Sequence, residues 1–165
     1  MESVTCPHCG NTHEGHPTDR SWTLPDEVWA IPEVERKAKA KYTTDLCQYG
    51  NRYFIRCLIQ VPFCDNPGYF GWGVWAEVDW PTFQKYLEIY EKDASNEPRV
   101  MGRLANQPPG YENLLNEEVQ IQFGAATERP SIWFPENSKL KMAEEQRAGI
   151  DSARYHEILE ITGPI

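Results

Sequence analysis

Apolar and polar side chains alternate most regularly over residues 52–61. A period of two is typical of a β-strand that buries one of its faces. Residues 46–49 and a following Gly-Asn pair predict the first arm of a β-hairpin, and residues 71–78 predict a further strand. The apolar faces are Tyr53, Ile55, Cys57, Ile59 and Val61 in the first long strand and Trp72, Val74, Ala76 and Val78 in the second, while Phe54, Arg56, Leu58 and Gln60 share the other face of the first.

A helical period replaces this alternation after Asp79, which is a suitable N-cap for a helix with Pro81 in its first turn. Apolar residues then recur at i, i+3, i+4 and i+7. Such a stripe predicts a helix that packs on the core, and we assign its aromatic residues to packing rather than to a ligand site. The stripe consists of Phe83, Tyr86, Leu87 and Tyr90.

Two further regions predict helix. Residues 25–41 form the first, and Pro32 divides it into two short pieces. The second begins at about Lys141; Gly149 breaks it, and Asp151 caps the final segment. Residues 1–24, by contrast, have the composition of a loop.

Short alternating runs at residues 100–104, 118–123 and 131–134 complete the set of expected strands. Consecutive strands, rather than a strict alternation of strand and helix, predict an α+β fold with a mainly antiparallel sheet and flanking helices. A length of 165 residues is that of one domain. We therefore expect a single domain, 1–165, with an N-terminal loop region over 1–24 and an α+β body over 25–165.

The charge of the chain restricts its partners. It contains 16 Lys+Arg and 25 Asp+Glu, so the formal net charge is −9. An acidic surface repels phosphate backbones, which disfavours nucleic acid and suits a basic protein partner. No apolar run approaches the roughly 20 residues of a membrane span, and residues 1–5 lack the features of a signal peptide. We expect a cytoplasmic protein without membrane contact.

Cysteine usage adds candidate chemistry at the N-terminus. The count of five is odd, which disfavours a disulfide framework. Cys6 and Cys9 form a Cys-x-x-Cys pair followed by a glycine, and two thiolates at this spacing can bind one tetrahedral zinc ion. A redox pair or incidental thiols are the alternatives, although a redox pair usually follows a strand and opens a helix.

One Cys-x-x-Cys pair supplies only two ligands, so the others must come from elsewhere. We select Cys47 and His13, the fourth ligand being the least determined. Cys57 fits a small buried residue on a strand. His8 and His16 fit solvated loop positions, so the expected structural Zn²⁺ site is Cys6, Cys9, Cys47 and His13 within an N-terminal zinc-binding loop.

Several short motifs occur in a fixed order along the chain. They are Cys6-x-x-Cys9-Gly10-x-x-His13-x-Gly15, Glu35-Arg36, Asp45-Leu46-Cys47, Phe54-Ile55-Arg56, Gly71-Trp72-Gly73-Val74-Trp75, Pro109-Gly110-Tyr111, Arg129-Pro130 and Glu145-Gln146-Arg147-x-Gly149-Ile150. In this order they resemble the bacterial domain-of-unknown-function 2199 family over about residues 6–162. The resemblance favours Cys6, Cys9, Cys47 and His13 as the metal set and implies little about activity. Leu140-Lys141 stands where family members often carry His-Pro.

Outside the metal set, Arg56, Arg129, Glu145 and Arg147 are candidates for a polar pocket that binds a carboxylate or phosphate. Structural ion pairs across the sheet are the competing interpretation. Signatures of zinc proteases, zinc deaminases, serine hydrolases and nucleotide-binding loops are absent from the sequence. No catalytic residue is assigned.

We interpret the chain as a non-enzymatic, zinc-stabilised bacterial binding protein with a protein partner. Two alternatives stay open. An immunity-type inhibitor of a basic toxin or other protein would use the net charge of −9. A small zinc-dependent hydrolase would need an open coordination position on the metal, whereas several thiolate ligands favour a closed structural site.

Overall fold

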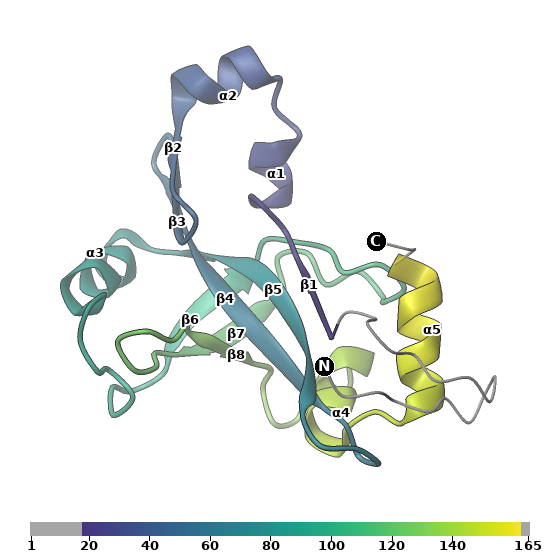
Figure 1. Ribbon diagram of the computed structural model, residues 1–165. Coiled ribbons are helices and arrows are strands. Elements are labelled where there is room, and N and C mark those ends of the chain that lie inside the picture. Colours follow the sequence, from purple (N-terminus) through teal and green to yellow (C-terminus); the bar gives the residue numbers. More distant parts are fainter. Residues whose placement is uncertain (1–17, 163–165) are drawn as a thin grey trace.

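The computed structural model describes residues 18–162 (Figure 1). Its strands are β1 (Asp19–Ser21), β2 (Ala40–Tyr42), β3 (Leu46–Tyr49), β4 (Arg52–Pro62), β5 (Tyr69–Val78), β6 (Val100–Leu104), β7 (Glu118–Gln122) and β8 (Ser131–Trp133). Its helices are α1 (Asp26–Trp29), α2 (Glu33–Lys39), α3 (Trp80–Ile89), α4 (Lys141–Ala148) and α5 (Ser152–Thr162). The mixed α+β class expected from the sequence is confirmed.

Five of the strands close into a barrel. The pairing runs β4–β5–β6–β7–β8 and returns from β8 to β4 through a parallel contact at Leu58 and Ser131. The Leu58 backbone N–H donates to the Pro130 carbonyl at 2.9 Å, which secures this closure. Closure is possible because β4 and β5 are long enough to serve several neighbours: β4 pairs with β3 near its start and with β8 further along. The sequence predicts the antiparallel pairing but not the closed sheet.

The barrel interior is the main core. Its β4 face matches the purer apolar face expected from the alternation, since Ile55, Cys57, Ile59 and Val61 are fully buried there. Trp72, Val74, Ala76 and Val78 of β5 belong to the same cluster, as do Phe83 and Tyr86 of α3. Burying a large apolar side chain contributes roughly 1.5–3 kcal/mol, so this face dominates the stability of the barrel.

A second, smaller apolar cluster forms on the opposite face of β4 and β5, where α1 covers the sheet. Asn106 anchors this cluster: its Oδ1 accepts the Trp75 backbone N–H at 2.8 Å and its Nδ2 donates to the Leu24 carbonyl at 3.0 Å. Burial of Asn106 is therefore offset by hydrogen bonds on both ends of the amide. The members of the cluster are Leu24, Val28, Ala40, Cys47, Phe54, Trp75 and Ala105.

Two strands replace loop or helix expected from the sequence. The three residues of β1 lie within the expected loop region and pair in parallel with β5. The approach is close because Gly73 lacks a side chain; a Cβ there would lie 2.8 Å from the Ser21 Cβ. The second expected helix piece ends at Lys39, and the chain continues as β2, in which Ala40 pairs with Tyr49 of the hairpin.

The caps and breaks expected for the helices are confirmed. Asp79 accepts the Thr82 backbone N–H at 2.9 Å, and Asp151 accepts the Arg154 backbone N–H at 2.8 Å. Gly149 ends α4 with φ of 85°. Among residues 18–162, no helix is both long and apolar enough to cross a membrane.

Candidate functional site

A pocket of about 620 Å³ lies over the face of β4 that points away from the barrel core. Helix α3 contributes Tyr86 to it, the C-terminal cap of α3 contributes Tyr90, and the segment leading into β8 contributes residues 126–129. Small-molecule sites commonly have volumes of about 300–1,000 Å³. The full lining is Asp45, Leu58, Gln60, Tyr69, Tyr86, Tyr90, Ala126, Thr127, Glu128, Arg129 and Ser131.

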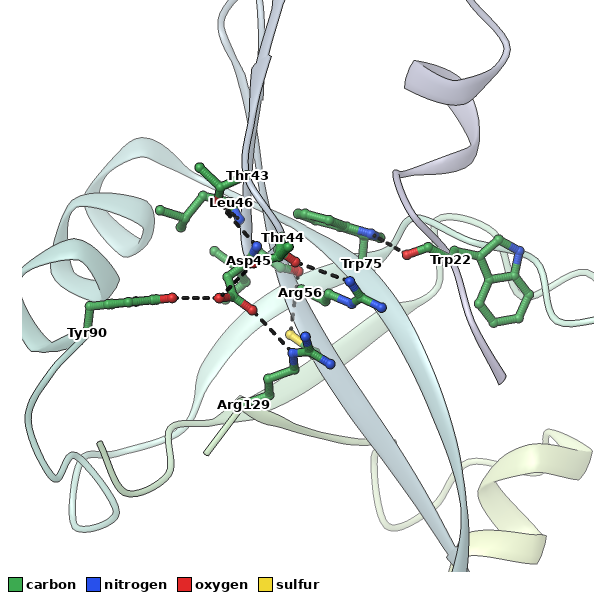
Figure 2. A network of polar contacts seen from close by, with 11 residues as sticks. Trp22, Thr43, Thr44, Asp45, Leu46, Arg56, Trp75, Tyr90 and Arg129 are labelled. Carbon is green, nitrogen blue, oxygen red and sulfur yellow. Dashed lines mark hydrogen bonds and ion pairs between the residues drawn. The ribbon is translucent and has the colours of Figure 1, made fainter. Parts of the chain in front are cut away.

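Asp45 joins three elements at one end of this pocket (Figure 2). Its Oδ1 accepts the Arg129 Nε–H at 3.2 Å, and its Oδ2 accepts the Tyr90 hydroxyl at 2.5 Å. The turn that carries it is fixed by the Thr43 hydroxyl, which accepts the backbone N–H groups of Asp45 and Leu46 at 3.2 and 3.1 Å. The carboxylate is therefore held by its own turn as well as by its partners.

These contacts set the protonation of the pair. Burial alone would raise the pKa of Asp45, but the hydrogen bonds from Tyr90 and Arg129 and the charge of Arg129 outweigh it and hold the pKa below its usual value. The hydrogen bond to Asp45 in turn raises the pKa of the Tyr90 hydroxyl. Asp45 is accordingly a carboxylate, and Tyr90 a neutral donor, at neutral pH.

Arg56 lies beside this network with few partners of its own. Its Nη1 donates to the Thr44 carbonyl at 3.3 Å. Its Nε is buried and has no hydrogen-bond partner among the residues that the structure describes. Burial lowers the pKa of the Arg56 guanidinium, and the nearby charge of Arg129 lowers it further. Asp45 forms its ion pair with Arg129, so the nearby guanidinium of Arg56 has no carboxylate of its own among the described residues.

The four residues expected to form one polar pocket occupy different surroundings. Arg56 and Arg129 are brought together at Asp45. Glu145, on α4, instead pairs with Arg154 of α5 at 2.7 Å, and Arg147 donates to the Ser138 carbonyl at 2.7 Å. The first contact joins α4 to α5, the last two helices along the chain (Figure 1), and the second joins α4 to the loop that precedes it.

Asp45 and Tyr90 complete the site, although neither was selected from the sequence as a ligand-binding residue. Tyr90 belongs to the apolar stripe of α3, yet its side chain is 40% exposed and its hydroxyl faces Asp45. The sequence indicates this exposure only through the place of Tyr90 at the end of the stripe, where the helix face leaves the core. Asp45 lies two residues before Cys47, and a single acidic residue in a turn carries no sequence signal for ligand binding.

Of the expected zinc ligands, Cys6, Cys9 and His13 lie outside the described residues. Cys47 is fully buried in the second apolar cluster, and burial raises the pKa of its thiol to about 12. Within residues 18–162 no group of three or more His, Cys, Asp or Glu side chains could hold a metal ion. Cys57, expected as a buried strand residue, lies in the barrel core, and its Sγ is 3.6 Å from the Ile55 carbonyl.

Comparison with known proteins identifies the family of the chain. The family described as uncharacterized protein conserved in bacteria (DUF2199) matches residues 5–150. No curated protein and no solved structure matches the chain. The match is consistent with the resemblance seen in the sequence motifs, and the family description names no activity.

Proposed function

Since the chain belongs to the DUF2199 family of uncharacterized proteins conserved in bacteria, we propose its function from the geometry of its pocket. The protein is a non-enzymatic binding protein that holds the anionic group of a small molecule between Arg56 and Arg129. The observation that carries this proposal is the buried Nε of Arg56, which has no partner among the described residues.

The energetics of a buried donor support an anion as the partner. A buried polar group without a hydrogen bond costs about 1–3 kcal/mol, and more when it carries charge. Arg56 is not among the residues that line the pocket, so its side chain has to turn toward the pocket before a carboxylate or phosphate oxygen accepts this N–H. An anion bound there would also neutralise the charge that Asp45 leaves uncompensated. Guanidinium groups suit such anions because their N–H groups form a planar fork.

A purely structural role accounts for Arg129 better than for Arg56. Arg129 forms an ion pair with Asp45 and reaches the pocket surface with 44% of its side chain exposed. Arg56 has no carboxylate within ion-pair distance among the described residues. A cross-sheet ion pair, the competing interpretation, therefore explains only one of the two arginines.

Structural zinc is the second part of the proposal and has the Cys-x-x-Cys spacing of Cys6 and Cys9 as its support. His13 and Cys47 complete the proposed ligand set. Cys47 fits this role only where the metal itself deprotonates it, because its apolar surroundings favour the neutral thiol. A protein partner in place of a small molecule would have the net charge of −9 as its support.

Titration calorimetry with inorganic phosphate and with acetate tests the anion site. We expect saturable binding of at least one of them to the full chain, weakened at least tenfold by Arg56→Gln. Arg147→Gln is the matched control, because it removes an arginine that donates to Ser138 away from the network. Ionic strength is held constant with chloride, since exposed charges are screened by salt.

A second variant keeps the test valid if the first one does not fold. Should Arg56→Gln lose its native circular dichroism spectrum, Arg129→Gln is used instead with the same expectation. Equal affinity in the wild type and in a folded variant of either arginine would overturn the proposal. So would the absence of any binding by both anions at millimolar concentration.

A further inference from the structure

The charges that line the pocket have both signs, which favours a ligand that carries a positive group besides its anionic one. Besides Arg129, the lining includes two carboxylates, Asp45 and Glu128. Asp45 is occupied, because it accepts hydrogen bonds from both Arg129 and Tyr90. Glu128 forms no ion pair with any residue of the described part of the chain and is exposed. A ligand that also carried a positive group would bind more tightly than a simple anion, because Glu128 would attract that group.

Glu128 is folded back over its own loop by the shape of that loop. Its backbone N–H donates to the Ala125 carbonyl at 3.0 Å, which closes a turn. Gly124 lies beneath its side chain, and a Cβ on Gly124 would be 3.0 Å from Glu128 Oε2. The absence of a side chain at Gly124 therefore gives the carboxylate room to lie against the loop at the edge of the pocket.

Aromatic rings provide further surface that suits a cation. Tyr69, on β5, and Tyr90, at the C-terminal cap of α3, line the pocket and are 44% and 40% exposed. An ammonium group over the face of an exposed tyrosine gains about 0.5–1 kcal/mol. The wall of the pocket thus combines the Arg129 guanidinium, which is paired with Asp45, with the Glu128 carboxylate and tyrosine rings.

We infer that the ligand is zwitterionic, an α-amino acid whose carboxylate lies at Arg129, with Arg56 turning toward it, and whose ammonium group is recognised by Glu128. This inference rests on the proposed function and deepens it. The pocket volume of about 620 Å³ accommodates a large side chain as well as both charged groups. The rings of Tyr69 and Tyr90 offer their faces to the ammonium group.

The experiment compares three charge types on one body. Each of the common L-amino acids is first titrated into the full chain at millimolar concentration, and the tightest binder is taken forward. It is then compared with its analogue lacking the amine and with its decarboxylated amine. We expect the amino acid to bind at least tenfold more tightly than either, and Glu128→Gln to reduce the difference from the deaminated analogue to less than threefold.

The outcomes separate the inference from the proposal beneath it. If the deaminated carboxylate binds as tightly as the amino acid and still depends on Arg56, the anion site stands and the zwitterion is wrong. If no amino acid binds while phosphate or acetate does, the inference is also overturned and the proposed function survives. If neither amino acids nor simple anions bind, both fail. Glu118→Gln, on β7 outside this pocket, is the matched control for loss of a surface carboxylate.

Discussion

The Nε of Arg129 lies 3.2 Å from Oδ1 of Asp45, although 84 residues separate them in the chain. This contact joins the loop that leads into β8 to the turn that opens β3. Tyr90 adds α3 to the same carboxylate through its hydroxyl. Three parts of the chain thus meet at Asp45, and this convergence positions Arg129 next to Arg56.

Removing the Tyr90 hydroxyl tests how firmly the network is held. Tyr90→Phe deletes a 2.5 Å hydrogen bond to a charged acceptor. We expect the free energy of unfolding, measured by urea denaturation, to fall by about 1 kcal/mol. This is less than is usual for a hydrogen bond to a charged group, because Tyr90 is partly exposed. Tyr42→Phe changes a comparably exposed tyrosine, on β2 rather than in this network, and should alter stability by less than about 0.5 kcal/mol. Equal effects of the two substitutions would show that the hydroxyl contributes nothing specific.

Asp45 should make stability depend on acid. Its pKa is lower in the folded protein than the ordinary value of 3.8, so its stabilising effect is fully present above that value and is lost as pH falls through the lower, folded pKa. Asp45→Asn removes this contribution. The difference in free energy of unfolding between wild type and Asp45→Asn should therefore shrink as the pH is lowered from neutrality toward strongly acidic values. A difference that stays constant across that range would contradict the folded-state pairing.

Gly149 tests the junction between α4 and the barrel. Alanine there would be strained at φ of 85°, and its Cβ would lie 2.9 Å from the Pro62 carbonyl oxygen. Gly68 also has a positive φ, of 92°, but a Cβ there meets nothing within 4 Å. We expect Gly149→Ala to lower stability by at least about 1 kcal/mol more than Gly68→Ala, because only the first adds a backbone clash. Thermal unfolding of the two variants measures the difference. Equal melting temperatures would contradict the predicted clash at position 149.

The zinc proposal is tested by metal content and thermal stability together. Protein purified without added metal or chelator should contain about one zinc per chain by elemental mass spectrometry. Cys9→Ser should lose that zinc and unfold at a lower temperature, because structural zinc contributes directly to folding. Cys64→Ser, at an exposed cysteine, is the control and should retain the metal. An unchanged melting temperature in Cys9→Ser would contradict a structural role for zinc.

Replacing Cys47 by alanine distinguishes a zinc ligand from a packing residue in the same assay. As a zinc ligand, it should lose metal when changed to alanine. As a packing residue among Leu24, Phe54 and Trp75, it should keep the metal and lose stability only through the small cavity that is left. Zinc content of the variant therefore decides whether its burial reflects coordination or packing.

Much of the fold follows from local pattern, and its closure does not. The alternation along β4 and β5 identifies the residues that fill the barrel, because side-chain direction depends only on position along a strand. The pairing of Leu58 with Ser131 depends on contacts between distant segments, which a local period does not contain. The same holds for β1, whose pairing with β5 depends on a glycine at position 73 of the other strand.

The site follows the same division. Arg56 and Arg129 could be selected as polar groups on or beside strands, but their meeting depends on the long-range contact at Asp45. Glu145 had the same appearance in the sequence and pairs instead with Arg154, nine residues further along. Residue type therefore indicates which side chains can bind an anion, and the topology decides which of them meet.

The central claim is that an anion binds at Arg56, and nuclear magnetic resonance of the arginine Nε–H groups tests it most directly. Assigned ¹⁵N-labelled protein is titrated with inorganic phosphate or acetate at constant ionic strength. The account predicts saturable shifts of the Arg56 and Arg129 Nε–H signals, with Arg147 unchanged. Arg56 and Arg129 signals that stay in place, or that shift no more than that of Arg147, would contradict it.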